Sequence, residues 1–402
     1  MKRLCTPAAT LALSLCLSLL AGCSTLPGWM IVQGRSGLGD ARHFDNASIA
    51  RSATPRPLPA PAQPVTLRWP GDWASESVEA WLAEQDTVAL VVLRRGELVY
   101  ERYFNGYDRE RAVESFSVAK SVVSAMLGIA IGEGRIAGVD EPVTRWLPEL
   151  ATHDARFAQI RLRHLLSMRS GIRFNESYGN PFSEAAYFYL GPDLKAQVAR
   201  LEIAGPPDQA YHYSSGDTQL LSMVVERAMG APFAALVQQR LWQPMGAGFD
   251  ASWSLDSAAG GVARGFCCLN ARALDYARFG QLFLDGGAVG GRQVVPADWV
   301  RASTRAQDGL PGADAAARLN LERPGTLRAA FYAWQWRRLP EPAPAATPAE
   351  ALRPGGSFFA QGLHGQYIVV VPETQTVVVR LGRSHGQVVW PRWLDRLARL
   401  NP

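Results

Sequence analysis

The feature that most constrains this chain is the apolar segment at residues 117–132, with the sequence SVAKSVVSAMLGIAIG. Apolar or small residues fill nearly every position, so a helix over this segment has no wide polar face to turn towards water. Such a helix needs protein on nearly all sides and is expected at the centre of a large domain. The 402 residues, 48% of them hydrophobic and 19% charged, can supply that core, and they exclude a disordered protein.

Strands are predicted near both ends of the chain, with helices between them. The predicted strands are residues 87–94, 97–104, 366–371 and 376–381, each rich in β-branched or aromatic residues. From about residue 140 to 320 the apolar spacing is mostly helical, and residues 390–400 form a further amphipathic helix. We therefore expect an α/β fold of the α+β kind, with one sheet assembled from both chain ends and a helical lobe inserted at about residues 116–325.

The N-terminal segment resembles a bacterial lipoprotein signal. Lys2 and Arg3 precede an apolar run at residues 11–20 that is too short to span a membrane as a helix, and Leu-Ala-Gly then leads to Cys23. We expect acylation of Cys23 and a lipid-anchored protein in the bacterial cell envelope, on the periplasmic face of the outer membrane. The alternative is an ordinary cleavage site with an incidental cysteine. The predicted divisions are a signal peptide at residues 1–22, a lipidated, proline-rich tether and arm at 23–65, and a folded domain at 66–402.

Charge and cysteine content exclude several classes of partner. The formal net charge of +5 comes from scattered arginines, so nucleic acid is not expected as a partner. The five cysteines lack the Cys-x-x-Cys or Cys/His spacing of a zinc site, so we expect no metal and no other cofactor. Adjacent cysteines rarely bond to each other, because the resulting ring strains the peptide between them. We therefore expect Cys267 and Cys268 to be small buried apolar residues without a disulfide.

Lysine usage points to one candidate base. The chain has three lysines, at positions 2, 120 and 195, and takes most of its positive charge from arginine. Arginine keeps its proton in proteins, whereas a desolvated lysine can release it, so a lysine on an apolar helix is a candidate general base. Lys120 follows Ser117 by one helical turn, where the two side chains can meet, and N–H groups at a helix start can hold an oxyanion. The alternative is a helix-capping Ser117 beside a Lys120 that extends to solvent.

Further motifs follow the Ser117-x-x-Lys120 pair in a fixed order. They are residues 162–171 (LRHLLSMRSG), 213–215 (YSS), 266–270 with 275–280 (FCCLN and DYARFG), and 362–367 (GLHGQY). Together they resemble the serine β-lactamase and penicillin-recognising enzyme superfamily, and most closely the class C-like hydrolases of the 6-aminohexanoate-dimer hydrolase branch. The resemblance runs from about residue 70 to the C-terminus. It implies a β-lactamase/transpeptidase-like fold, in which helices flank an antiparallel sheet.

The resemblance also implies roles for individual residues. Ser117 is the acylated nucleophile, Lys120 its general base, and Tyr213 the proton relay to the leaving group. The backbone N–H of Leu363 joins that of Ser117 in holding the oxyanion. The expected substrate-binding residues are Ser215, Gly362, His364 and, by a looser match, Tyr178. For Tyr213 the alternative is an aromatic side chain that only packs between helices.

Two departures from the family pattern bear on the substrate. Ser215 stands where β-lactamases have an asparagine, which alters the contact to the substrate amide. The family's Lys-Thr-Gly or His-Thr-Gly strand motif aligns with residues 360–362 (AQG), which carry no cation to bind a substrate carboxylate. An alternative register places residues 363–365 (LHG) there and restores a histidine.

These observations predict an envelope lipoprotein serine hydrolase that cleaves a linear amide or ester through an acyl-serine intermediate. A β-lactamase or D,D-peptidase uses the same nucleophile and is the alternative enzyme. A non-catalytic envelope sensor is the alternative from a different class. The sequence does not identify the natural substrate or the preference between ester and amide, because substrate specificity depends on loops whose conformation has no sequence pattern. The oligomeric state also stays open.

Overall fold

A seven-stranded antiparallel sheet forms the centre of the molecule, with the strand order β11-β12-β13-β14-β15-β2-β3. Its strands are β2 (Thr87–Arg94), β3 (Glu97–Tyr103), β11 (Phe331–Tyr332), β12 (Arg337–Arg338), β13 (Phe358–Gly362), β14 (Gln366–Val371) and β15 (Thr376–Gly382). Because β15 pairs with β2, strands from the two ends of the chain meet within one sheet. The expected sheet is confirmed, and the four predicted strands agree with the observed bounds to within one residue.

The computed structural model describes residues 36–63, 65–71, 75–258, 260–305, 331–339 and 356–401. The predicted signal peptide and Cys23 lie outside these residues. Within the described residues, no single helix is long and apolar enough to cross a membrane, although one bent pair of helices, Ser215–Met229 with Phe233–Trp242, passes on length and composition.

Both faces of the large sheet are buried, which explains the valine runs in β14 and β15. Val377 and Val379 of β15 face one hydrophobic core, whereas Val378 faces a second core on the other side. The helices that cover the two faces are α11 (Ala273–Leu284) on the first core, and α3 (Ser75–Glu84) with α14 (Trp390–Leu400) on the second. A strand buried on both sides needs apolar residues at every position, so simple alternation is lost.

The apolar segment forms helix α4 (Ala119–Gly132), as the sequence predicts. All of its residues from 119 to 130 are buried. It packs against α9 (Ser215–Met229) and α12 (Ala297–Thr304). Gly128 permits the approach of α12, because a β-carbon at this position would lie 2.3 Å from the Trp299 ring.

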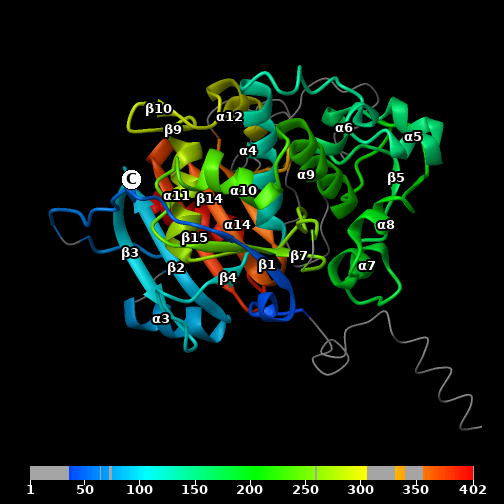
Figure 1. The fold of residues 1–402 in the computed structure, drawn as a ribbon. Helices are drawn as coiled ribbons and strands as arrows, with labels where there is room; N and C mark the ends of the chain where they lie inside the picture. The colour runs from blue at the N-terminus through cyan, green and yellow to red at the C-terminus, as the bar shows by residue number, and fades with distance from the viewer. Residues whose placement is uncertain are drawn as a thin grey trace, which may run out of the picture.

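The helical lobe lies beside the large sheet, in green in Figure 1. Its elements are α5 (Glu149–His153), α6 (Leu162–Leu166), α7 (Glu184–Leu190), α8 (Leu194–Val198), α9, α10 (Phe233–Val237), and the strand pair β5 (Ile172–Arg173) and β6 (Glu202–Ile203). Short turns and a hairpin complete the described chain: η1 (Asp40–His43), η2 (Phe116–Val118), η3 (Val143–Arg145), η4 (Ala155–Gln159), the π-helix η5 (Gln238–Trp242), η7 (Leu363–Gly365), η8 (Pro372–Thr374), β9 (Ala288–Val289) and β10 (Arg292–Gln293).

A second antiparallel sheet, which we did not predict, has the order β1-β7-β8-β4. Its strands are β1 (Asp45–Ile49), β4 (Val113–Glu114), β7 (Ala251–Leu255) and β8 (Leu269–Ala271). β1 belongs to the N-terminal arm and pairs with β7, while β4 leads directly into η2 and α4. This sheet therefore fixes the segment that begins the apolar helix.

Candidate active site

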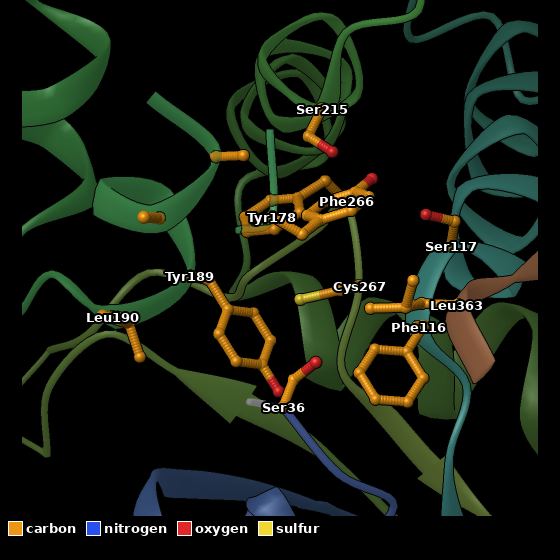
Figure 2. Close-up of a pocket in the computed structure, with 12 residues that line it drawn as sticks. Ser36, Phe116, Ser117, Tyr178, Tyr189, Leu190, Ser215, Phe266, Cys267 and Leu363 are labelled. Carbon is orange, nitrogen blue, oxygen red and sulfur yellow. The ribbon is translucent and has the colours of Figure 1, made fainter. Parts of the chain in front are cut away.

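Ser117 lies in the short turn η2, immediately before α4. The preceding residue, Phe116, has a φ of +45°, a conformation that residues with side chains rarely adopt. The backbone of its neighbour Ser115 is held by strand β8, because the Ser115 N–H donates to the Leu269 carbonyl at 2.8 Å. The turn places Ser117 in the lining of a pocket (Figure 2). A strained backbone held at a pocket wall is common at functional sites.

Lys120 meets Ser117 as the one-turn spacing predicts. Only 2% of this lysine is exposed. Its Nζ donates to Ser117 Oγ at 3.0 Å, to Ser215 Oγ at 3.1 Å and to the Phe266 carbonyl at 2.8 Å. The three acceptors fix the position of Nζ, so the alternative of a Lys120 that extends to solvent does not hold.

The environment of Lys120 favours its neutral form. Burial lowers the pKa of Lys120 from 10.5 to about 8; the Glu176 carboxylate opposes this shift, and the Arg337 guanidinium adds to it. With a pKa near 8, about a tenth of the lysine is neutral at pH 7. That fraction is far larger than for an ordinary lysine, so Lys120 can accept a proton near neutral pH.

Tyr213 faces the same pair of residues. Its ring centroid lies 5.1 Å from Lys120 Nζ, and its hydroxyl hydrogen-bonds with Ser117. Burial raises the pKa of Tyr213 above its ordinary value of 10. The phenol is therefore neutral at physiological pH, where it can donate a proton, and Lys120 is the better proton acceptor of the two.

The motif at residues 162–171 holds the loop that carries Tyr213. The Met168 carbonyl accepts from the His212 N–H at 2.8 Å, immediately before Tyr213. Ser170 Oγ donates to Asp217 Oδ1 at 2.7 Å, in the first turn of α9 just after that loop. The motif therefore acts by positioning the tyrosine rather than by touching Ser117.

Glu176 belongs to the site, although we did not predict it. Its Oε1 accepts from Ser215 Oγ at 2.5 Å and from Tyr178 Oη at 2.5 Å, while Oε2 accepts from the Ser215 N–H at 2.8 Å. Ser215 thus links this carboxylate to Lys120. Glu176 precedes Ser215 by 39 residues in a loop without periodic pattern, so only the fold brings the two together.

Arg337 is a second residue that sequence reasoning missed. Its guanidinium carbon lies 5.4 Å from the ring centroid of Tyr213 and 5.6 Å from that of Tyr332. Arg337 belongs to β12, which pairs with β13. Residues 360–362 on β13 carry no cation, but the neighbouring strand brings one beside the site.

The end of β13 lies next to Ser117. Leu363, the residue after the strand, lines the same pocket. A β-carbon on Gly362 would lie 2.3 Å from the Ser115 carbonyl, so this glycine allows the strand to approach η2. His364 instead contacts the N-terminal arm: its Nε2 lies 3.2 Å from Ser36 Oγ, and its ring packs edge-on against Phe116 at 5.1 Å.

The pocket brings together four of the predicted site residues and is otherwise mostly apolar. It holds about 590 Å³ of space, its open mouth included. Its lining residues are Ser36, Phe116, Ser117, Tyr178, Ala185, Ala186, Tyr189, Leu190, Ser215, Phe266, Cys267 and Leu363. Tyr178 is 54% exposed, and helix α7 supplies the wall opposite Ser117 (Figure 2).

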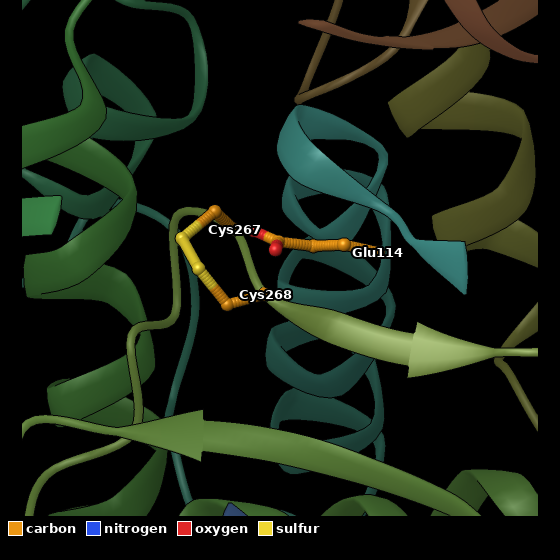
Figure 3. A group of neighbouring side chains, drawn as sticks. All are labelled: Glu114, Cys267 and Cys268. Atoms are coloured by element: carbon orange, nitrogen blue, oxygen red, sulfur yellow. A yellow bond between two sulfur atoms is a disulfide. The ribbon is translucent and has the colours of Figure 1, made fainter. Parts of the chain in front are cut away.

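Cys267 and Cys268 are buried as predicted, but they are joined in a disulfide, which corrects the expectation of two free thiols. Glu114 lies beside them (Figure 3), and these three form the one group of metal-ligand side chains found in the described part of the chain. Because the thiolate is the form of cysteine that ligates metals, the bonded sulfurs do not offer such a site.

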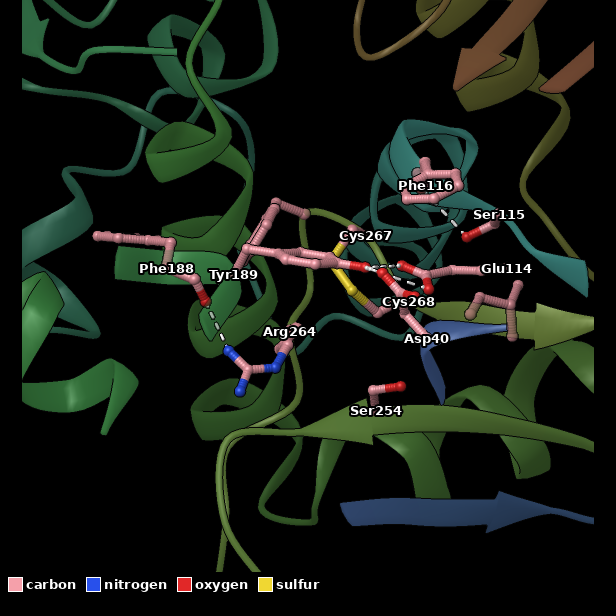
Figure 4. Close-up of a disulfide and its surroundings, with 12 residues drawn as sticks. Asp40, Glu114, Ser115, Phe116, Phe188, Tyr189, Ser254, Arg264, Cys267 and Cys268 are labelled. Atoms are coloured by element: carbon pink, nitrogen blue, oxygen red, sulfur yellow. Dashed lines mark hydrogen bonds between the residues drawn. A yellow bond between two sulfur atoms is a disulfide. The ribbon is translucent and has the colours of Figure 1, made fainter. Parts of the chain in front are cut away.

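Two buried carboxyl groups share one tyrosine behind the disulfide. Tyr189 Oη lies 3.0 Å from Asp40 Oδ2 and 3.1 Å from Glu114 Oε1 (Figure 4). Burial raises the pKa of both carboxyls, and that of Glu114 well above its ordinary value. The charge of Asp40 adds to this rise for Glu114, because two carboxylates near each other repel. This cluster attaches the N-terminal arm, through Asp40, to the wall of the pocket.

Comparison with known proteins places this chain in a family. The beta-lactamase family model matches residues 78–388. The 6-aminohexanoate-dimer hydrolase of Paenarthrobacter ureafaciens is 29% identical over 349 residues, which cover 83% of this chain and 82% of that protein. Esterase EstB of Burkholderia gladioli is 30% identical over 176 residues, which cover 39% of this chain and 44% of EstB.

Solved structures share the fold. A Bacillus anthracis protein provisionally designated a 6-aminohexanoate-dimer hydrolase superposes with a TM-score of 0.72 at 22% identity, over 90% of this chain and 93% of that one. EstCE1, described as a hydrolase with promiscuous acyltransferase activity, gives a TM-score of 0.59 at 18% identity, over 81% of this chain and 96% of its own. The family model covers most of the chain, and it confirms the resemblance carried by the ordered motifs. The chain therefore belongs to the beta-lactamase family, and it is related by sequence to a 6-aminohexanoate-dimer hydrolase and to an esterase.

Proposed function

We propose that this protein is a serine hydrolase that cleaves a linear amide or ester through an acyl-Ser117 intermediate. The observation that carries the proposal is the 3.0 Å contact between Ser117 Oγ and the Nζ of a buried lysine whose pKa is about 8. In the first step, neutral Lys120 takes the Ser117 proton as Oγ attacks the substrate carbonyl carbon.

The neighbouring groups complete the reaction. Tyr213 passes a proton to the departing amine or alcohol, which its neutral phenol supports. The backbone N–H groups of Ser117 and Leu363 hold the oxyanion, and the place of Leu363 in the pocket lining, directly after β13, supports that role. A water molecule then attacks the acyl-serine and releases the acid.

The lining of the pocket supports a largely apolar acyl or amine group. Alanine, leucine and aromatic side chains form most of its wall. Ser215 and Tyr178 are the polar groups that we assign to substrate binding. The names of the two curated relatives, a hydrolase of the 6-aminohexanoate dimer and an esterase, agree with an amide or ester substrate.

A β-lactamase or D,D-peptidase is the second candidate, and Arg337 is the observation that favours it. A guanidinium binds a carboxylate through charge-assisted hydrogen bonds, and the substrates of these enzymes carry a carboxylate. Arg337 lies against Tyr213, within the same part of the molecule as Ser117 and Lys120.

One experiment separates the candidates. Purified protein is incubated with a fluorophosphonate, with short p-nitrophenyl esters and with nitrocefin, and the labelled residue is located by mass spectrometry. We expect a label on Ser117 and no label in Ser117→Ala. Because residues 360–362 carry no cation to bind the carboxylate of nitrocefin, we also expect a kcat/KM for esters about ten- to a hundredfold above that for nitrocefin. A higher value for nitrocefin would transfer the assignment to the second candidate. An unlabelled Ser117 would reject both and leave the non-catalytic sensor.

A further inference from the structure

The Cys267–Cys268 disulfide lies next to a residue that orients the catalytic lysine. The Phe266 carbonyl accepts the shortest of the three hydrogen bonds from Lys120 Nζ, at 2.8 Å. The two bonded cysteines follow Phe266 directly, and strand β8 begins at Leu269. The disulfide thus occupies the whole connection between the lysine's acceptor and the sheet.

The backbone of this connection has an unusual conformation. Cys268 has a φ of +74°, in the left-handed region that is unfavourable for residues with a β-carbon. On the sheet side, the Cys268 carbonyl accepts from the Ser254 N–H at 3.0 Å. On the other side, the Cys267 N–H donates to the Arg264 carbonyl at 3.1 Å. The small covalent ring between the two cysteines limits rotation at the point where the chain would otherwise relax.

One of the two sulfurs faces the pocket. Cys267 is 4% exposed and belongs to the pocket lining, and Figure 2 shows its sulfur directed into the pocket. Cys268 is fully buried and does not line the pocket (Figure 4). A small reductant that enters the substrate pocket therefore meets Cys267 first.

We propose that the Cys267–Cys268 disulfide positions Lys120 through the Phe266 carbonyl, so that thiol reductants lower the reactivity of Ser117. This inference rests on the proposed function, because it assumes that Lys120 activates Ser117. With the ring opened, Cys268 relaxes from its left-handed conformation and the Phe266 carbonyl moves away from Nζ. The cysteines are positioning residues in this scheme, since neither one touches the reacting atoms.

The redox step is an ordinary exchange with a dithiol. One thiolate of the dithiol attacks Cys267 Sγ, the bond between the two cysteine sulfurs breaks, and Cys268 leaves as a thiolate that takes up a proton. The second dithiol sulfur then attacks the mixed disulfide and releases Cys267, which is also protonated. Two electrons and two protons pass from the dithiol to the protein, and the dithiol becomes a cyclic disulfide.

The first test compares one protein in two redox states. The full chain is treated with dithiothreitol, and the freed thiols are counted by iodoacetamide adducts on the peptide that contains residues 266–268. We expect the rate of Ser117 labelling by a fluorophosphonate to fall at least about tenfold on reduction and to return on reoxidation. Equal rates in the two states would overturn the proposal. An oxidised protein that shows no labelling at all would instead reject the proposed function.

Two double variants test the role of the disulfide without a reductant. Cys267→Ala with Cys268→Ala removes the ring and disfavours the left-handed conformation. Cys267→Ala with Cys268→Gly removes the ring but accepts that conformation freely. We expect the alanine pair to label at least about tenfold more slowly than the oxidised wild type, and the glycine pair to stay within about threefold of it.

The pH profile separates positioning from general damage. The Phe266 carbonyl favours the charged lysine, so its withdrawal in the alanine pair lowers the pH midpoint of labelling as well as the plateau. A merely structural loss reduces the plateau and leaves the midpoint in place. Dithiothreitol must have no effect on the alanine pair, which serves as the reductant control. Equal rates in the alanine pair and the wild type, or equally slow glycine and alanine pairs, would contradict the mechanism.

Discussion

At the scale of single residues, an acidic and a basic neighbour shift the pKa of Lys120 in opposite directions. Burial supplies the largest effect on the pKa of Lys120, Glu176 raises this pKa, and Arg337 lowers it. In the proposed mechanism, labelling of Ser117 requires the neutral amine, so its rate should rise with pH through a midpoint near 8. The midpoint then reports directly on the groups around the lysine.

Removing either neighbour should move this midpoint in a known direction. Arg337→Gln removes a positive charge that disfavours the ammonium, so the midpoint moves up. Glu176→Gln removes a negative charge that favours the ammonium, so the midpoint moves down. Labelling rates from pH 6 to 10 measure both shifts. Arg173→Gln and Glu202→Gln, which break an exposed ion pair on β5 and β6, are charge-matched controls and should leave the midpoint unchanged.

The proposed general base, Lys120, can be replaced by arginine, which has the same charge. Lys120→Arg cannot accept the Ser117 proton, so acylation should fall by at least about a hundredfold, the lower end for loss of a positioned base. The measurement is the second-order rate of fluorophosphonate labelling, with circular dichroism to check the fold. Near-normal labelling would assign Lys120 a structural role.

At the scale of elements, Gly128 and Gly362 each allow a close approach between two elements. We expect substitution of Gly128 to affect stability and substitution of Gly362 to affect reactivity. Gly128 faces the Trp299 ring within the core, whereas Gly362 faces the Ser115 carbonyl beside the nucleophile. Gly128→Ala should therefore lower the free energy of unfolding by about 1 to 3 kcal/mol through overpacking, with the labelling rate unchanged in the folded protein. Thermal unfolding and labelling together measure this outcome.

Gly362→Ala should instead slow labelling in protein that is still folded. The new β-carbon displaces β13 from η2 and with it the Leu363 N–H, which we propose as an oxyanion donor. The expected loss is about a hundredfold. Equal labelling in Gly362→Ala and Gly128→Ala would show that the end of β13 is remote from the reaction.

Sequence alone predicted the long elements and the pair of residues at the centre of the candidate site. The apolar helix, the four long strands and the C-terminal helix have strong local patterns. Ser117 lies in η2, one turn before Lys120 on the apolar helix α4. The second sheet was missed in part because two of its four strands, β4 and β8, are only two and three residues long. Glu176 and Arg337 were missed because they reach the site from loops or strands far away in sequence, which no local pattern records.

At the scale of the whole molecule, attachment to the envelope stays a prediction. Cys23→Ser removes the residue expected to carry the acyl chains, so the protein should appear in soluble or unprocessed form instead of in the membrane fraction. Fractionation with determination of the mature N-terminus measures the outcome. An unchanged membrane fraction with its N-terminus at another residue would contradict the lipoprotein prediction.

The pairing of β15 with β2 has a consequence for how the chain reaches its native state. Thr376 of β15 pairs with Arg94 of β2, and the helical lobe lies between these strands in sequence. The hairpin of β2 and β3 therefore keeps an unpaired edge until the last strands have been synthesised, and folding must close a loop of this length. Such a topology delays completion of the large sheet until both ends of the chain are available.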